Sequence, residues 1–151
     1  MDVSVSRADL SDLDELAPLF DGYRQFYEQK SDLAAAKAFL RERIERGESV
    51  IFIARADGRP GGFTQLYPSF SSVSMARIFV LNDLFVSQNA RKLGIGRRLL
   101  DAAANYARNA GAVRLTLSTA VTNSPAQALY ESTGWKRDQK FYAYNLTLPS
   151  Q

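Results

Sequence analysis

The segment that most constrains the fold runs from a strand through a glycine-bearing turn into a helix. Residues 76–86 form the longest strand candidate, and residues 91–96 (Arg-Lys-Leu-Gly-Ile-Gly) connect it to apolar residues at helical spacing. Backbone N–H groups at a helix start lack intrahelical partners and attract anions. Gly94 and Gly96 allow close approach to the backbone, and Arg91 and Lys92 supply positive charge. The segment therefore predicts a phosphate site at a helix N-terminus.

Two familiar phosphate-binding motifs fit this segment poorly. The dinucleotide-binding fingerprint needs a third glycine, and Leu99 stands at that position. The P-loop needs Gly-Lys followed by Ser or Thr, which the chain lacks. An ordinary helix start with a solvated basic face remains the alternative interpretation.

Hydrophobic periodicity predicts further elements on both sides of this segment. Strands are expected at residues 3–6, 50–54, 62–67, 76–86, 112–119 and 141–148, helices at 11–28, 31–47, 95–111 and 123–134, and a polar loop at 68–74. The order β-α-α-β-β-β-α-β-α-β is typical of a mixed α/β protein, and no linker or repeat interrupts it. We expect a single domain over residues 1–151.

Two residue types are missing, and this limits the available chemistry. The chain has no cysteine and no histidine. Disulfides, a thiol nucleophile, histidine-bearing zinc sites and a Ser-His-Asp triad are therefore excluded, and we expect no bound metal. Acid–base chemistry must use carboxylates, tyrosine, lysine, backbone groups or water.

The net charge of +3 conceals a division along the chain. Residues 1–48 carry eleven acidic and seven basic side chains, whereas residues 49–151 carry five acidic and twelve basic ones. This favours an anionic partner for the second part and a cationic one near the first. No apolar run approaches the ~20 residues of a membrane span, and the first residues do not resemble a signal peptide, so we expect a cytoplasmic protein without a membrane partner.

Two motifs in the second part resemble those of a known family. Arg91-x-x-Gly94-x-Gly96 after an apolar strand is similar to the acetyl-CoA signature of the GNAT N-acetyltransferases. Downstream, Asn123, Ala126, Leu129-Tyr130-Glu131 and Gly134-Trp135 resemble the family's other recurrent segment. The resemblance implies a mixed, mostly antiparallel sheet that is flanked by helices and contains a central pair of parallel strands that splay apart.

The same resemblance implies acetyl-CoA as co-substrate and a set of residues that bind it. The pantetheine arm is expected along the backbone of Leu84, Phe85 and Val86, with an N–H near Leu84 polarising the thioester carbonyl. The pyrophosphate is expected over the turn and helix start, with a contact from Asn123 to the pantetheine. The turn and helix-start residues are Arg91, Lys92, Leu93, Gly94, Ile95, Gly96 and Arg97.

The resemblance also implies two catalytic residues. Tyr130 is expected to donate a proton to the departing thiolate, although packing on an apolar helix face would also explain it. Asp83 is expected to accept the proton of the incoming amine; its alternative role is that of a structural aspartate at a β-bulge. Some relatives carry a glutamate base where Asn82 stands, so that duty moves to Asp83 or to water.

The acceptor is the least constrained part of the prediction. Residues 23–27 and 81–86 resemble segments of the polyamine and histone/polyamine acetyltransferases, which suggests a small primary amine or a lysine side chain. Tyr23 and Tyr27 are expected to line the acceptor pocket, and Glu28 to attract a cation, with core packing and a solvated helix face as alternatives.

Other functions remain open at this stage. The acceptor could instead be an aminoglycoside, an amino acid or a protein N-terminus, or the chain could be a non-catalytic acyl-CoA-binding regulator. A nucleic-acid partner is not expected, because the basic residues gather at one turn without interleaved aromatic residues. The terminal strand at 141–148 could pair with the edge of a second copy to form a homodimer.

Overall fold

The computed structural model describes residues 2–150, and these fall into two units with the division after Ser118. The first unit holds a five-stranded sheet and three of the helices, and the second holds one helix and the C-terminal segment. We describe each unit by itself.

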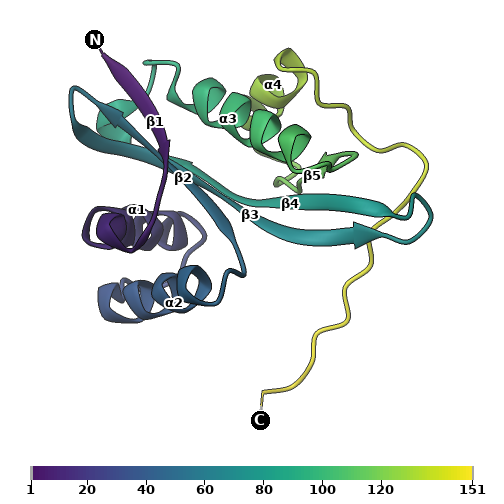
Figure 1. Cartoon of the computed structure of the whole chain (residues 1–151), viewed down its shortest axis with the longest axis horizontal. Helices are drawn as coiled ribbons and strands as arrows, with labels where there is room; N and C mark the ends of the chain where they lie inside the picture. The colour runs from purple at the N-terminus through teal and green to yellow at the C-terminus, as the bar shows by residue number, and fades with distance from the viewer. Residues whose placement is uncertain (1, 151) are drawn as a thin grey trace. The chain divides into compact units, whose positions relative to one another are not determined.

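The first unit is built on a sheet with the strand order β1-β2-β3-β4-β5 (Figure 1). Neighbouring strands are antiparallel except for β4 and β5, which are parallel. The strands are β1 (Val3–Arg7), β2 (Val50–Ala56), β3 (Arg59–Ser71), β4 (Ala76–Val86) and β5 (Leu115–Thr116). A mixed, mostly antiparallel sheet with one parallel pair confirms the predicted fold class.

Helices cover both faces of this sheet (Figure 1). Helix α1 (Leu13–Phe26) and α2 (Leu33–Glu45) lie on one face, and α3 (Ile95–Asn109) lies on the other. Short 3₁₀ turns precede α1 (η1, Leu10–Asp12) and α3 (η2, Gln88–Ala90). Because side chains alternate along a strand, Ile51 and Ile53 of β2 join the core under α1 and α2, whereas Ala54 joins the core under α3.

The loop between α1 and α2 is held by a buried carboxylate. Asp21 of α1 accepts hydrogen bonds from Ser31 Oγ at 2.6 Å, from the backbone N–H of Asp32 at 2.8 Å and from Gln25 Nε2 at 3.0 Å. The Ser31 and Asp32 hydrogen bonds lower the pKa of Asp21. This cluster fixes the turn that follows the tyrosines of α1.

The second unit contains α4 (Ser124–Ser132). Asn123 caps this helix, since its side-chain oxygen accepts a hydrogen bond from the backbone N–H of Ala126 at 3.2 Å, and Pro125 occupies the first turn. The expected helix start is therefore confirmed.

The expected strand at 141–148 is wrong: residues 133–150 form neither helix nor strand. The apolar residues of the alternating pattern are largely exposed, as Tyr142 and Tyr144 are at 90% and 91%. A strand needs a hydrogen-bonded neighbour, and none lies in this unit. As a result the parallel pair β4–β5 ends the sheet instead of lying at its centre, and the homodimer through this segment stays a prediction.

The expected loop at 68–74 is also mostly wrong, because β3 continues to Ser71 and pairs with β4 as far as Ala76. Pro68 is tolerated there since β2 pairs with β3 only up to Leu66, so nothing requires the N–H that proline lacks. The expected strand at 112–119 shortens to the two residues of β5.

Candidate active site

A β-bulge on β4 sets the position of the acidic residue that the sequence singled out. Gln65 of β3 pairs with Asp83, but the next pair is Leu66 with Leu81, so Asn82 is the extra residue. Asn82 is exposed, whereas Asp83 is only 2% exposed. The bulge thus turns a carboxylate into the face of the sheet that α1 covers.

Hydrogen-bond donors surround the Asp83 carboxylate. Asn82 Nδ2 donates to Oδ1 at 2.8 Å, and Gln65 Nε2 donates to Oδ2 at 2.5 Å. Burial raises the pKa of Asp83, and the hydrogen bonds from Asn82, Gln65 and Tyr23 act in the opposite direction. Burial thus makes this carboxylate a better proton acceptor, whereas its donors stabilise the ionised form.

Tyrosine rings gather around this carboxylate. The hydroxyl of Tyr23 donates to the backbone oxygen of Asn82 at 3.0 Å, and the ring of Tyr27 packs edge-on against it at a centroid distance of 5.2 Å. Burial, followed by the charge of Asp83, raises the pKa of Tyr67 to about 12 and that of Tyr23 further. Both phenols are therefore neutral at physiological pH. Tyr23 lies between Tyr27 and the Asp83 segment, and the roles of the three residues toward an acceptor stay predictions.

Gln65 and Tyr67 belong to this site although the sequence analysis did not identify them. Phe63, Gln65 and Tyr67 occupy every second position along β3, and their side chains therefore share the face that α1 covers. That alternation is visible in the sequence, but the register that sets Gln65 opposite Asp83 depends on the bulge. Glu28 lies on the exposed turn after α1, with a φ of 66°, and its role toward a cationic acceptor stays a prediction.

The edge of β4 beyond Val80 is open to an added strand. Strand β5 pairs with β4 only at Phe79 and Val80 among the described residues. Ser87 donates its N–H to Gly61 at 2.8 Å, and hydrogen-bonded and non-hydrogen-bonded pairs alternate in an antiparallel ladder. The N–H and C=O groups of Phe85 therefore point toward β3, whereas those of Leu84 and Val86 point toward the edge that β5 leaves uncovered.

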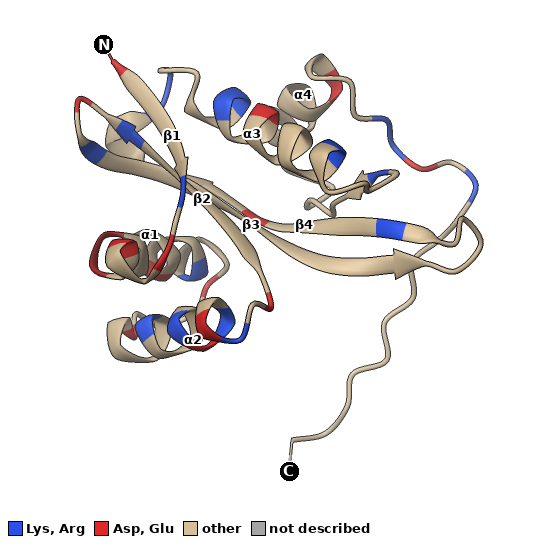
Figure 2. Ribbon diagram, viewed as in Figure 1, with Lys and Arg blue, Asp and Glu red and all other residues tan. Residues whose placement is uncertain are grey.

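The turn that leads into α3 has the features of an anion site. Gly94 caps the helix with a φ of 76°, and no atom lies within 4 Å of the position where a Cβ would stand. Lys92 also has a positive φ, of 67°, and Arg91 Nε donates to the backbone oxygen of Val86 at 3.4 Å. Figure 2 shows basic residues along this turn and in the first turn of α3.

Two glycines of β3 bring the start of α3 close to the sheet. A Cβ on Gly61 would lie 3.0 Å from Ile95 Cδ1, and one on Gly62 would lie 2.7 Å from the backbone oxygen of Phe85. Ile95 is 1% exposed and packs with Ala54 in the core under α3. The turn is therefore anchored by a buried side chain while Gly94 remains exposed.

Most acidic side chains near the start of α1 are engaged in ion pairs. Arg55 contacts Asp12 at 2.8 Å and Glu15 at 2.7 Å, and Lys37 pairs with Asp14. These pairs account for much of the acidic character of the first 48 residues. The carboxylate that remains for a cationic acceptor in the tyrosine cluster is Asp83.

The second unit carries the two remaining predicted residues. Asn123 uses its side-chain oxygen as the helix cap, and Tyr130 of α4 packs against Trp135 at a centroid distance of 6.1 Å. The backbone N–H of Trp135 donates to the oxygen of Tyr130 at 3.0 Å. Their roles toward acetyl-CoA stay predictions.

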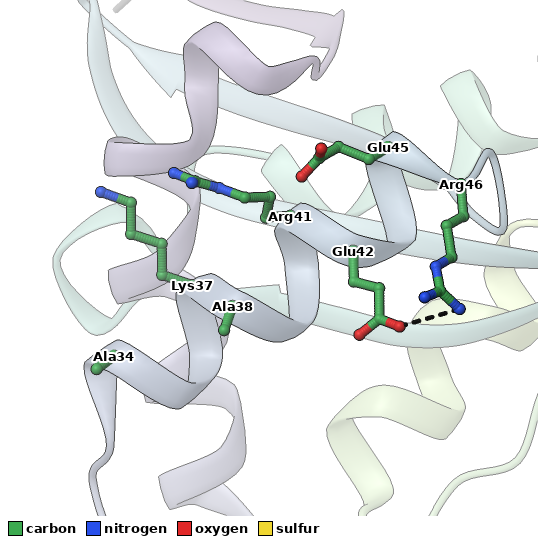
Figure 3. A pocket seen from close by; sticks show the side chains of 7 residues that line it. All are labelled: Ala34, Lys37, Ala38, Arg41, Glu42, Glu45 and Arg46. Atoms are coloured by element: carbon green, nitrogen blue, oxygen red, sulfur yellow. Dashed lines mark ion pairs between the residues drawn. The ribbon is translucent and has the colours of Figure 1, made fainter.

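A hollow of about 670 Å³ lies along the outward face of α2 (Figure 3). Its lining comes from this helix alone: Ala34, Lys37, Ala38, Arg41, Glu42, Glu45 and Arg46. Arg46 and Glu42 pair across one turn at 3.2 Å. None of these residues belongs to the predicted site.

Two further features are absent from the described residues. They contain no group of three or more His, Cys, Asp or Glu side chains arranged to hold a metal ion. None of the helices in residues 2–150 is long and apolar enough to cross a membrane.

The open strand edge, the helix N-terminus and the mixed sheet together define the class of GNAT-like α/β folds. The model of the acetyltransferase (GNAT) family matches residues 13–135. The chain belongs to this family and is an N-acetyltransferase. The family uses acetyl-CoA as acyl donor.

Individual relatives agree with this assignment. An uncharacterized N-acetyltransferase of Bacillus subtilis, YhfO, is 52% identical over 99% of this chain and 100% of its own length. The crystal structure of a probable acetyltransferase superposes with a TM-score of 0.92 at 45% identity and covers 98% of this chain and 99% of its own. A thialysine N-epsilon-acetyltransferase of Caenorhabditis elegans is 27% identical over 81% of this chain and 76% of its own length.

Proposed function

We propose that this enzyme transfers the acetyl group of acetyl-CoA directly to the primary amine of a small alkylamine or a lysine side chain. Asp83 acts as general base and Tyr130 as general acid. The observation that carries the proposal is the buried Asp83 carboxylate, which lies in a tyrosine cluster one residue before the open edge of β4.

The residues of the first unit fit the donor. The open edge at Leu84 and Val86 offers N–H and C=O groups to the amide-bearing pantetheine arm, and the N–H of Leu84 suits the thioester carbonyl. The exposed turn at Gly94 offers helix N–H groups and the charges of Arg91 and Lys92 to the pyrophosphate. Leu93, Ile95, Gly96 and Arg97 complete the turn, and Asn123 is assigned to the pantetheine. When bound, the donor supplies an acetyl thioester, which an uncharged amine attacks.

The acceptor amine must lose a proton before it attacks, since an alkylammonium has a pKa of about 10.4. The N–H bond of the ammonium breaks, its electron pair stays on nitrogen, and the proton passes to the Asp83 carboxylate. The ring faces of Tyr23 and Tyr27 attract the cation before this step, and Glu28 assists from the exposed turn.

The departing thiolate needs a proton in turn. The amine nitrogen bonds to the acetyl carbon and releases its second proton to solvent, the C–S bond breaks, and the Tyr130 hydroxyl gives its proton to sulfur. The phenolate then recovers a proton from solvent. Because this step uses a residue of the second unit, we propose that residues 1–151 work as one catalytic domain.

An alkylamine acceptor is supported by two observations. The cluster around Asp83 is aromatic, and among the described residues no second carboxylate is one of the groups that shift the pKa of Asp83. The Caenorhabditis elegans relative is named for acetylation of the ε-nitrogen of thialysine, and this points to a lysine-like amine here.

A panel of amines with acetyl-CoA, followed by release of free thiol, tests the proposal. Diamines and lysine derivatives are expected to turn over, whereas aminoglycosides and α-amino acids with blocked side chains are expected to react at least tenfold more slowly. The Asp83→Asn variant is the matched control, and its rate of thiol release with the protonated diamines and lysine derivatives is expected to fall at least about 100-fold. Equal rates for aminoglycosides and diamines would contradict the acceptor assignment. A panel in which none of the amines leads to thiol release would contradict the proposed acetyl transfer to an amine.

A further inference from the structure

One buried polar atom beside Asp83 has no partner. Gln65 is completely buried, and its Nε2 donates to Asp83 Oδ2 at 2.5 Å. Its other terminal atom, Oε1, has no hydrogen-bond partner among the described residues. An unsatisfied buried acceptor destabilises the folded state, so its presence beside the proposed base calls for an explanation.

The two protonation states of Asp83 make opposite demands on this neighbour. An ionised carboxylate only accepts hydrogen bonds, and the NH₂ group of Gln65 satisfies Oδ2 in that state. Once Asp83 has taken the proton of the acceptor amine, Oδ2 carries an O–H and becomes a donor. The NH₂ group would then face another donor, whereas the unpartnered Oε1 could accept from it.

We propose that Gln65 is a positioning residue whose side-chain amide flips when Asp83 gains a proton and flips back when Asp83 loses it. One side chain thereby stabilises both protonation states of the base. The proposal rests on the proposed function in one respect, namely that Asp83 accepts the proton. In the turned orientation Oε1 accepts from the Oδ2–H group. Return of the proton to solvent restores the NH₂ group as donor.

The other groups around the carboxylate are neutral. The Tyr23 hydroxyl of α1 donates to the backbone oxygen of Asn82, and burial keeps Tyr67 of β3 neutral by raising its pKa. Tyr27 shifts the pKa of Tyr23, and Arg43 of α2 shifts the pKa of Tyr67, but neither is among the groups that shift the pKa of Asp83. No cation is among the groups that shift the pKa of Asp83. Burial, opposed by its hydrogen bonds and not by a salt bridge, therefore sets the pKa of this carboxylate.

Asn82 provides a matched comparison on the other carboxylate oxygen. Its Nδ2 donates to Oδ1 at 2.8 Å, as Gln65 does to Oδ2, but its side chain is exposed. Water can therefore serve the Asn82 amide in both states of Asp83. Loss of either donor favours the protonated carboxyl, but only loss of Gln65 removes the buried acceptor that the protonated state needs.

The experiment compares Gln65→Met, which keeps the length of the side chain, with Asn82→Ala across the pH profile. In both variants the acidic limb of kcat/KM is expected to move to higher pH. In Gln65→Met alone the kcat of the pH-independent plateau is expected to fall about tenfold, which corresponds to one lost hydrogen bond to a buried group. Equal plateaus in the two variants would overturn the proposal.

A double-mutant cycle with Asp83→Asn separates positioning from a structural role. If Gln65 acts through Asp83, adding Gln65→Met to Asp83→Asn changes the residual kcat less than twofold. A second tenfold loss in that background would show a structural effect and refute the inference. Acetyl-CoA affinity by calorimetry, expected to be unchanged, confirms that each variant is folded. An Asp83→Asn variant with wild-type kcat and pH profile would instead refute the proposed base itself.

Discussion

The Asp83→Asn variant replaces the buried carboxylate by an amide. It separates the effect of Asp83 on the stability of the fold from its effect on catalysis. Burial raises the pKa of Asp83, so the folded state holds a proton on this group more tightly than the unfolded chain does. The stability that this provides is complete below the ordinary value of 3.8 and is lost as pH rises through the higher folded-state pKa. Wild-type protein thus carries a growing penalty for the buried charge as pH rises and the carboxyl ionises.

The amide removes this penalty and supplies a missing hydrogen bond. Once the Gln65 amide has turned, its unpartnered Oε1 accepts from the new NH₂ group, and the oxygen of the new amide still accepts from Asn82. Satisfying one buried acceptor is worth about 1–3 kcal/mol. For a chain of this length each kcal/mol raises Tm by about 2–4 °C, so we expect Asp83→Asn to melt at least about 2 °C above wild type at pH 8.

The assay is thermal unfolding followed by circular dichroism from pH 4 to pH 8, together with kcat/KM at pH 8. The advantage in Tm is expected to shrink toward pH 4, where the wild-type carboxyl is protonated, while kcat/KM at pH 8 falls at least about 100-fold. A variant that melts lower than wild type at pH 8 and keeps its kcat/KM would show that Asp83 serves the structure of the bulge, and the reasoning would be refuted.

Three further substitutions test other parts of the site. Tyr130→Phe is expected to lower kcat about 10- to 100-fold without changing acetyl-CoA affinity, and an unchanged kcat at every pH would remove Tyr130 as the acid. Gly94→Val places a side chain at a φ of 76° and over the exposed turn, so calorimetry should show at least tenfold weaker acetyl-CoA binding; unchanged affinity would reject the phosphate site. Gly62→Ala places a Cβ 2.7 Å from a backbone oxygen of β4 and should lower the free energy of unfolding by about 1–3 kcal/mol in urea, and a neutral effect would contradict the tight packing.

The parts of the fold that depend on neighbouring residues could be predicted from the sequence. Helix α3 and the turn before it follow from local signals, namely Gly94 at the cap and apolar residues at helical spacing. The Asn123 cap with Pro125 behind it is equally local, and α4 begins where these residues predict. Strand β4 has the predicted bounds because it is apolar, long and flanked by turn residues.

The parts that depend on distant pairing could not be predicted in the same way. Residues 141–148 have a strand pattern, but a pattern does not provide a neighbouring strand, and the segment remains irregular. The polar residues 68–71 form a strand because β4 lies opposite them. Gln65 escaped notice for the same reason, since its position beside Asp83 results from the bulge at Asn82, and one residue of register decides which side chain a strand presents.

The most direct test of Asp83 as the base compares an acceptor amine that must lose a proton before it attacks with an acceptor amine that is already uncharged. A primary alkylamine is protonated at pH 7.5, whereas a fluorinated analogue with a pKa below 7 is largely uncharged. With Asp83→Asn, kcat/KM for the alkylamine is expected to fall at least about 100-fold, while that for the uncharged analogue stays within about threefold of wild type. An equal loss with both amines would contradict a base role for Asp83, because the carboxylate would then serve binding or structure alone.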